Sequence, residues 1–123
     1  MHFYNIIILT TAISYTQINP EKIDIVRDQY GIPHIFAKTD AELAYGLAWA
    51  NAEDDFNTIQ EAYLAGNAML SKHIGLKGAP ADFITQFIGS KELIDEKIGE
   101  ISDDYLKVIS GYAEGLNSYA EKN

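Results

Sequence analysis

A long helical segment with apolar residues on two of its faces constrains the fold more than any other feature of this sequence. Thr39, Asp40, Ala41 and Glu42 have the form of a capping box, in which the Thr39 side chain caps a backbone amide and Glu42 reaches back. The spacing predicts a helix from about Asp40 to about Ala65. One apolar stripe comprises Leu43, Leu47, Ala50 and Asp54, and a second comprises Tyr45, Trp49, Ala52, Phe56, Ile59 and Tyr63. A helix that is apolar on two sides needs cover on both, so we expect this one to lie in the middle of a larger body.

A β-hairpin is predicted before this helix. Residues 23–27 alternate in polarity and are rich in β-branched side chains, which is typical of a strand. Residues 28–31 predict a turn, in which Gly31 is free to adopt a positive φ. Pro33 keeps the chain extended, and residues 34–37 predict the second strand. Because two strands alone are marginally stable in water, we expect the hairpin to lie on a sheet or on helices.

The C-terminal half predicts a loop and two further helices. Residues 71–80 contain Gly75, Gly78 and Pro80 and predict a loop, and residues 81–88 predict a short, weakly amphipathic helix. A last helix begins around residues 102–104, where acidic side chains in the first turn suit the helix dipole. Its apolar stripe comprises Tyr105, Val108, Ile109, Tyr112, Leu116 and Tyr119.

Four glycines within the predicted helices indicate close contacts or a helix end. Gly46, Gly111 and Gly115 each weaken a helix; we interpret Gly46 as a place where another backbone approaches closely, and Gly111 and Gly115 as marks of close packing. We expect Gly66 to end the long helix as its C-cap.

Composition limits the classes of function. The chain has 123 residues, of which 47% are hydrophobic and 22% charged, so it is globular rather than disordered. A net charge of −9 argues against nucleic acid as a partner, because there is no basic stripe to bind phosphates. The absence of cysteine excludes a disulfide framework, a thiolate zinc site and a thiol nucleophile.

Residues 1–17 carry no Lys, Arg, Asp or Glu and contain an Ile-rich apolar run. This run is too short to span a membrane. We interpret residues 1–17 as a signal peptide, with Ala12 and Ser14 in a cleavage-site arrangement, and residues 18–123 as the folded domain. A buried first strand is the alternative.

Few residues offer chemistry. Glu53, Asp54 and Asp55 form the densest carboxylate cluster, but neighbouring residues of a helix point about 100° apart, so a solvated or capping role is favoured over a metal or salt-bridge role. His34 and His73 lack the spacing of a zinc site, and we interpret His34 as a strand residue rather than a catalytic base. The aromatic stripe is interpreted as core. We therefore assign no catalytic, cofactor-binding or metal-binding residue to this chain.

Three ordered motifs carry a resemblance to a known family. Arg27, Asp28, Tyr30, Gly31, Pro33, His34, Ile35 and Ala37 match the pattern R-D-x-Y-G-hydrophobic-P-H-I-x-A. The helix supplies Leu43, Tyr45, Gly46, Ala48, Trp49, Ala52 and Asp54, and residues 111–117 supply G-Y-A-E-G-L-N. Over residues 22–123 the chain resembles the opening of the α chain in the penicillin acylase family, which includes cephalosporin and acyl-homoserine-lactone acylases.

The resemblance implies an α+β fold, in which an N-terminal β-hairpin is followed by a helical segment and both are part of an αββα N-terminal nucleophile hydrolase sandwich. It implies an exported, periplasmic enzyme that is cut into α and β chains and cleaves linear N-acyl amide bonds of a small substrate. The Ser nucleophile, its α-amino base, the oxyanion donors and a calcium ligand are all expected downstream of residue 123. The implied partner is the acylase β chain or the remainder of the precursor, without which this chain is expected to be inactive.

One departure and one alternative remain. The family commonly has Asp-Arg where this chain has Asp54 and Asp55, which removes a guanidinium and reverses a charge. Trp49 and Asn51 favour the lactone-acylase side of the family. The alternative function is a small exported binding or scaffold domain derived from an acylase α chain.

Overall fold

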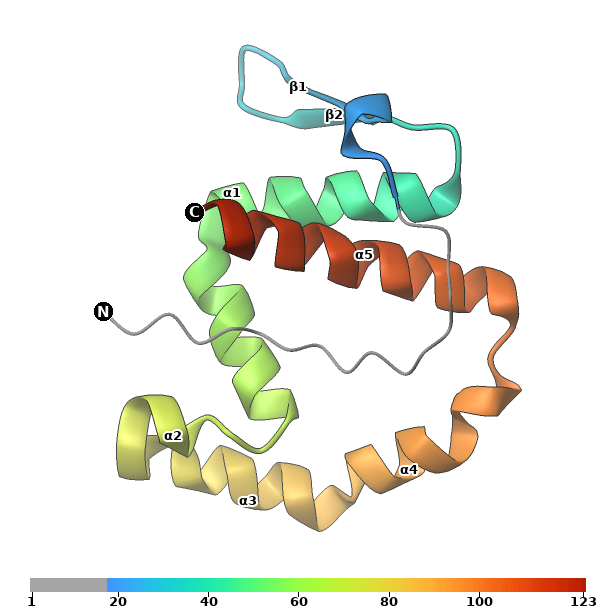
Figure 1. Cartoon of the computed structure of the whole chain (residues 1–123). Coiled ribbons are helices and arrows are strands. Elements are labelled where there is room, and N and C mark those ends of the chain that lie inside the picture. Colours follow the sequence, from blue (N-terminus) through green and yellow to red (C-terminus); the bar gives the residue numbers. More distant parts are fainter. Residues whose placement is uncertain (1–17) are drawn as a thin grey trace. The chain divides into compact units, whose positions relative to one another are not determined.

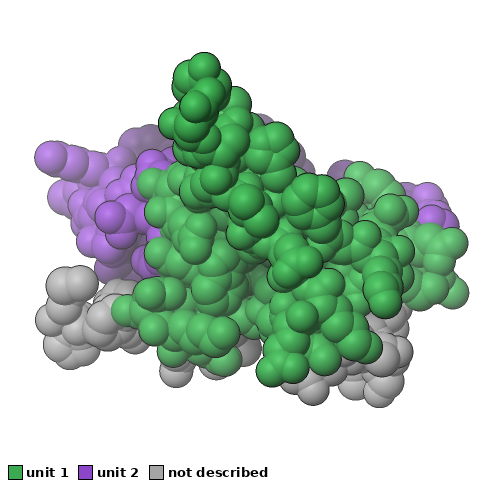
Figure 2. Space-filling model, turned by 90° about the horizontal axis from the view of Figure 1, so that it is seen from above, with its two compact units in different colours: residues 1–54, 103–123 green, residues 55–102 purple. Residues whose placement is uncertain are grey.

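The computed structural model describes residues 18–123, and the expected signal peptide of residues 1–17 lies outside this range. The chain divides into two compact units (Figure 2). Unit 1 comprises the chain up to Asp54 together with Asp103–Asn123, and unit 2 comprises Asp55–Ser102. None of the helices described from residue 18 onward is long and apolar enough to cross a membrane.

The predicted hairpin is confirmed in unit 1. After a 3-10 turn, η1 (Pro20–Lys22), strand β1 (Asp24–Arg27) pairs with strand β2 (Pro33–Phe36) in an antiparallel sheet of two strands. Asp24 lies opposite Phe36 and Arg27 opposite Pro33. Gly31 has a φ of 81°, as the predicted turn requires.

Helix α1 (Asp40–Gly66) begins with the predicted capping box. The Thr39 hydroxyl accepts the Glu42 N–H at 3.2 Å, and the Glu42 carboxylate accepts the Thr39 N–H at 3.1 Å. The prediction of one continuous helix is wrong at Asp55, whose φ of −158° and ψ of 76° interrupt it. The Asp55 carboxylate accepts the N–H of Thr58 at 3.1 Å and its hydroxyl at 2.6 Å. Asp55 therefore caps a second helical segment and places a kink at the unit boundary.

Glycines allow close packing on two sides of α1, as expected for Gly111 and Gly115, whereas the atoms that approach Gly46 belong to side chains and not to a backbone. On one side lies the hairpin, because a Cβ added to Gly46 would be 2.6 Å from Ile35 Cγ2 and 3.0 Å from Ile23 Cγ2. On another side helix α5 (Asp103–Lys122) runs alongside α1 in the same direction (Figure 1). A Cβ on Gly111 or Gly115 would collide with the backbone of α1.

The buried face of α1 differs from the predicted stripes. Its buried residues are small apart from Tyr45, and they are Ala44, Tyr45, Gly46, Ala48, Ala50 and Ala52. Leu43 and Leu47, which we expected to be covered, are 45% and 44% exposed. The kink also divides the aromatic stripe, so that Tyr45 and Trp49 belong to unit 1 and Phe56 and Tyr63 to unit 2. Close approach between backbones favours alanine and glycine over leucine at the contact.

The end of α1 corrects the interpretation of Gly66. Gly66 is the last residue of the helix, but the left-handed residue that terminates it is Ala68, with a φ of 53°. The Met69 N–H bonds to the Leu64 carbonyl at 2.7 Å, which is the six-to-one bond of a Schellman motif.

Unit 2 is helical where a loop was expected. It contains α2 (Ser71–Ile74), η2 (Gly75–Gly78), α3 (Ala79–Ile88), α4 (Ser90–Lys97) and η3 (Ile98–Glu100). The prediction of a loop over residues 71–80 is wrong, and α4 was not predicted. The first error has a tertiary cause, since the local Gly and Pro signals are overridden by bonds from Leu70 and Ser71 to Asp82, further along the chain.

Asp82 provides the main contact of this kind. It is 6% exposed, and its carboxylate accepts the N–H groups of Leu70 at 2.7 Å and Ser71 at 2.8 Å, as well as the Ser71 hydroxyl. Burial raises the pKa of Asp82, but the bonds from Ser71 and Leu70 outweigh it and hold the pKa below its usual value. Gly78 completes the turn, because a Cβ there would be 2.6 Å from the Ser71 nitrogen.

Candidate functional site

The carboxylate cluster at residues 53–55 serves two structural purposes. Glu53 and Asp54 face Arg27 of the hairpin, whereas Asp55 caps the second segment of α1. This arrangement agrees with the favoured capping role for Asp55 and with the alternative salt-bridge role for Glu53 and Asp54. In the part of the chain from residue 18 onward, no group of three His, Cys, Asp or Glu side chains could hold a metal ion.

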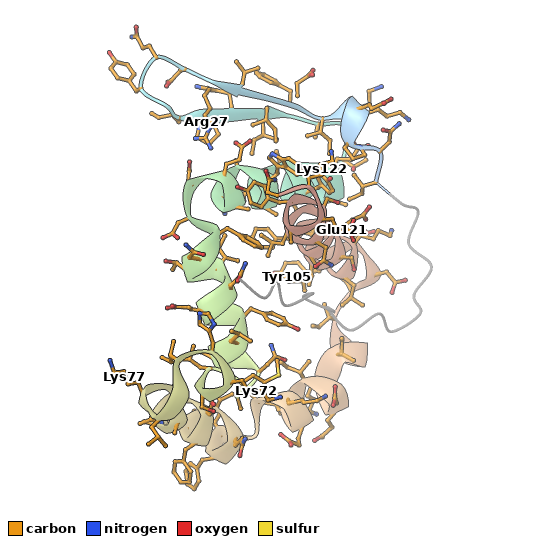
Figure 3. The ribbon with its side chains drawn as sticks, turned by 60° about the vertical axis from the view of Figure 1, so that its left-hand side comes forward. Arg27, Lys72, Lys77, Tyr105, Glu121 and Lys122 are labelled. Atoms are coloured by element: carbon orange, nitrogen blue, oxygen red, sulfur yellow. The ribbon has the colours of Figure 1, made fainter. Side chains whose placement is uncertain are left out.

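Arg27 joins the hairpin to α1, and Figure 3 shows it on the side of the hairpin that faces this helix. Its Nη1 donates to the Gly31 carbonyl at 2.8 Å, and its Nη2 donates to the Ala50 carbonyl at 3.2 Å. The same Nη2 lies 3.3 Å from Glu53 Oε2 and 2.9 Å from Asp54 Oδ1. The hydrogen bond with Glu53 is the largest cause of a raised Arg27 pKa. Both terminal nitrogens of the guanidinium thus hold the hairpin turn and α1 together.

Asp28 organises the hairpin turn beside it. Its Oδ1 accepts the N–H of Tyr30 at 2.8 Å and of Ile32 at 3.0 Å. The bonds from Ile32 and Tyr30 lower the pKa of Asp28. His34 lies in β2, as interpreted, with its Nε2 3.5 Å from Asp28 Oδ2. His73 lies in α2, a short helix of unit 2, so the structure does not bring the two histidines into one element.

An aromatic group lies where α1 and α5 meet. Trp49 stacks on Tyr45 with ring centroids 6.5 Å apart and receives the edge of Tyr119 at 5.4 Å. The Trp49 indole N–H donates to Glu53 at 2.9 Å, and the Lys122 ammonium lies 5.0 Å from the Trp49 ring. Figure 3 places Lys122 at the end of α5. These contacts support the interpretation of Tyr45 and Trp49 as packing residues.

A groove of about 800 Å³ lies in unit 1. It lies where η1, the first turn of α1 and the first half of α5 meet, and its charged lining residues are Lys22, Lys38, Asp40, Glu42, Asp104, Lys107 and Glu114. Both signs of charge alternate around it. Ile18, Ala41 and Val108 line it as well, so its walls combine charged and apolar groups.

Glu114 lines this groove, and the sequence predicted no contact for its side chain. Its carboxylate accepts the backbone N–H of Ile18 at 3.2 Å, and burial raises its pKa against the lowering effect of that bond. Its position between Gly111 and Gly115, the two glycines that face α1, could have indicated that this carboxylate lies near a packed helix contact. Its contact holds the start of the described chain to α5, which is a structural role.

Glu53, Asp54, Asp55 and Glu114 each make structural contacts within one unit. The assignment of no catalytic, cofactor or metal residue to this chain stays a prediction. Chemistry must therefore be argued from what the chain is similar to.

The sequence profile described as penicillin amidase matches residues 22–123. The chain belongs to the penicillin amidase family. The predicted resemblance to the α-chain segment of these acylases is confirmed, as is the prediction of a hairpin followed by helices in the α+β class.

Named relatives agree with this membership. Penicillin G acylase of Escherichia coli is 28% identical over 101 residues, which is 82% of this chain and 12% of that protein. Aculeacin-A acylase of Actinoplanes utahensis is 27% identical over 110 residues, which is 80% of this chain and 14% of that protein. Acyl-homoserine lactone acylase PvdQ of Pseudomonas putida is 27% identical over 97 residues, covering 72% of this chain and 13% of that relative.

A solved structure shares the fold. Thermostable penicillin G acylase from Alcaligenes faecalis superimposes with a TM-score of 0.74 at 27% identity, covering 81% of this chain and 53% of that chain. The present chain spans between 12% and 14% of the length of these three curated relatives. The activity of a whole acylase is consequently a proposal for this chain.

Proposed function

We propose that this chain is the N-terminal portion of an amidohydrolase that cleaves linear N-acyl amide bonds. The observation that carries the proposal is the match of the family profile to residues 22–123. This match includes the hairpin, α1 and α5, which are the packed elements of unit 1. On this proposal the chain supplies a scaffold and not the reacting groups.

The reacting groups are proposed to lie on polypeptide beyond this chain. A Ser exposed as the first residue of a β chain would be the nucleophile, and its own α-amino group would be the base. An amine with a pKa of about 8 can remove the proton of a Ser hydroxyl, which is otherwise a poor nucleophile. Without that chain, and without its oxyanion donors, we expect no catalysis.

The substrate is proposed to be a small N-acyl amide. The relatives are named for penicillin G, aculeacin A and acyl-homoserine lactones. Such substrates would share an acyl group joined to nitrogen, so hydrolysis of that bond is the reaction common to the group. The acyl specificity depends on pockets that the described residues do not form.

The partner is proposed to be the acylase β chain or the remainder of a precursor, and the site of action the periplasm after export. Calcium, where the enzyme uses it, would be bound by downstream residues.

Activity of a chimaeric enzyme tests the proposal. The segment of E. coli penicillin G acylase that aligns with residues 22–123 would be replaced by these residues, and maturation and hydrolysis of a chromogenic N-acyl amide measured. We expect a matured, active chimaera and no hydrolysis by the 123-residue chain alone. A stable chain that blocks maturation of the chimaera would favour the alternative of an independent binding or scaffold domain.

A further inference from the structure

Helix α3 has Asp82 and Thr85 turned into unit 2 and its large apolar residues turned outward, beside the exposed Gln86. Asp82 is 6% exposed and bonded to Leu70 and Ser71, and the Thr85 hydroxyl donates to the Ala65 carbonyl at 3.0 Å. The outward residues are Phe83, Ile84, Phe87 and Ile88, with exposed fractions of 68%, 56%, 82% and 65%. We call these four residues the α3 surface. Its polarity is the reverse of that of a helix on the outside of a soluble domain.

The α3 surface is organised before anything binds to it. The rings of Phe83 and Phe87 stack with centroids 6.1 Å apart and an interplanar angle of 18°. Asp82 and Thr85 fix the rotation of α3 through their bonds to Ser71 and Ala65, so the helix cannot turn its apolar side inward without breaking them. A contiguous apolar patch of this kind on a soluble chain indicates an interaction site.

The neighbouring helix α4 provides a contrast. Its Leu93 and Ile94 are also exposed, at 56% and 58%, but they are flanked on both sides by charged residues. Lys91 pairs with Asp95 at 2.9 Å along the helix surface. A helix with an ion pair on its surface and scattered apolar residues is typical of one that faces water. Exposure alone therefore does not distinguish α3, whereas the absence of charge among its outward residues does.

We propose that the α3 surface binds an apolar face of the acylase polypeptide that lies outside this chain, and this proposal rests on the proposed function. The family match includes the whole of unit 2, so the surface is part of the region shared with the acylases. The chain spans only 12% to 14% of the relatives' length, which leaves most of an acylase available to cover it.

Charge disfavours the other occupants. The chain carries a net charge of −9, so a second copy would bring an equal negative charge to the contact. An anionic lipid surface would repel the chain for the same reason.

The test uses co-expression in two pieces. E. coli penicillin G acylase lacking the segment that aligns with residues 22–123 would carry an affinity tag, and the present chain would be supplied as a separate polypeptide. The E. coli enzyme's own missing segment serves as the reference. Two double variants are compared with the unaltered chain, namely F83S/F87S on α3 and the matched control L93S/I94S on α4. Both replace two exposed apolar helical residues of unit 2 by serine.

We expect the unaltered chain and L93S/I94S to co-purify to within twofold of each other, and F83S/F87S to be recovered at least tenfold less. Equal recovery of F83S/F87S would overturn the α3 surface as the contact while leaving the proposed function intact. If the unaltered chain does not co-purify with the tagged enzyme, while the E. coli enzyme's own segment does, both proposals would be overturned.

Measurements on the isolated chain distinguish the other possible occupants of the α3 surface. We expect F83S/F87S to leave its urea midpoint and its molar mass by light scattering unchanged. A lower midpoint would show that the surface is already covered within the chain, and a dimer dissolved by F83S/F87S would show that a second copy covers it. Either result would overturn the proposal.

Discussion

Substitution of Gly111 by alanine is expected to loosen the contact between α1 and α5. The new Cβ would collide with the Ala41 carbonyl oxygen and would lie 2.9 Å from the Ala41 carbonyl carbon and 3.1 Å from its Cα. All three atoms belong to the backbone in the first turn of α1, which the capping box of Thr39 and Glu42 holds in place. No rotation of a flexible side chain can relieve such a contact, so the helices must move apart.

The size of the effect follows from these distances. Carbon atoms in good contact lie about 3.5–4.0 Å apart, so the helices must separate by roughly 0.5–1 Å at Gly111. Overpacking of this kind costs about 1–3 kcal/mol. Replacing glycine by alanine inside a helix recovers about 1 kcal/mol of propensity at most. We therefore expect G111A to lower the free energy of unfolding of unit 1 by about 1–2 kcal/mol.

Trp49 is the only tryptophan of the chain, and its ring contacts Tyr119 of α5. Its fluorescence during urea unfolding therefore reports on this pair of helices. With a urea dependence of about 1 kcal/mol/M for a small unit, the midpoint of G111A should fall by roughly 1–2 M. The control is G66A, read by circular dichroism as well, because a Cβ on Gly66 would have no neighbour within 4 Å. If G111A unfolds at or above the midpoint of the unaltered chain, the close approach of the two backbones is refuted.

Three further predictions concern other positions. A68G should raise the urea midpoint measured by circular dichroism. Glycine removes the cost of about 1–2 kcal/mol that alanine has in the left-handed conformation, and the greater entropy of glycine in the unfolded chain offsets part of this gain. A lower midpoint would contradict the Schellman geometry. Burial raises the pKa of Glu114 in the folded chain, so the neutral form stabilises the fold below the ordinary pKa of 4.5, and this contribution is lost as pH rises through the folded pKa. E114Q stays neutral at every pH. We therefore expect E114Q to be more stable than the unaltered chain at pH 7 and equally stable in acid. A gain that persists in acid would assign the effect to packing. R27K should lower the Trp49 fluorescence midpoint, because a single ammonium cannot bond Gly31 and Glu53 together, and an unchanged midpoint would show that this network contributes nothing.

Features predicted correctly from the sequence depend on residues close together in the chain. The capping box joins residues three apart, and the turn at Asp28 joins residues two and four apart. Gly46, Gly111 and Gly115 were predicted to mark close approach because glycine inside a helix is otherwise unfavourable. The identity of the approaching backbones, in contrast, was not contained in the local pattern.

Features that were missed depend on contacts across longer stretches. Asp82 caps residues that precede it by eleven and twelve positions, and no local pattern within residues 71–80 predicts such a bond. Glu114 accepts the N–H of Ile18 across 96 positions. In the same way, Arg27 reaches Ala50 across 23 positions, so the structural purpose of the carboxylate cluster became visible only in the folded chain.

The departure at Asp54 and Asp55 and the break in α1 have a common physical basis. A carboxylate at position 55 accepts both the N–H and the hydroxyl of Thr58, and these bonds favour the non-helical backbone observed there. An arginine at this position has no acceptor to offer the Thr58 N–H, so it cannot cap the second segment in this way. Asp54 meanwhile pairs with Arg27, which supplies a guanidinium from the hairpin instead of from the helix itself. Asp55 therefore ends the first segment of α1 and caps the second, while the hairpin and the α1–α5 contact of unit 1 depend on other residues.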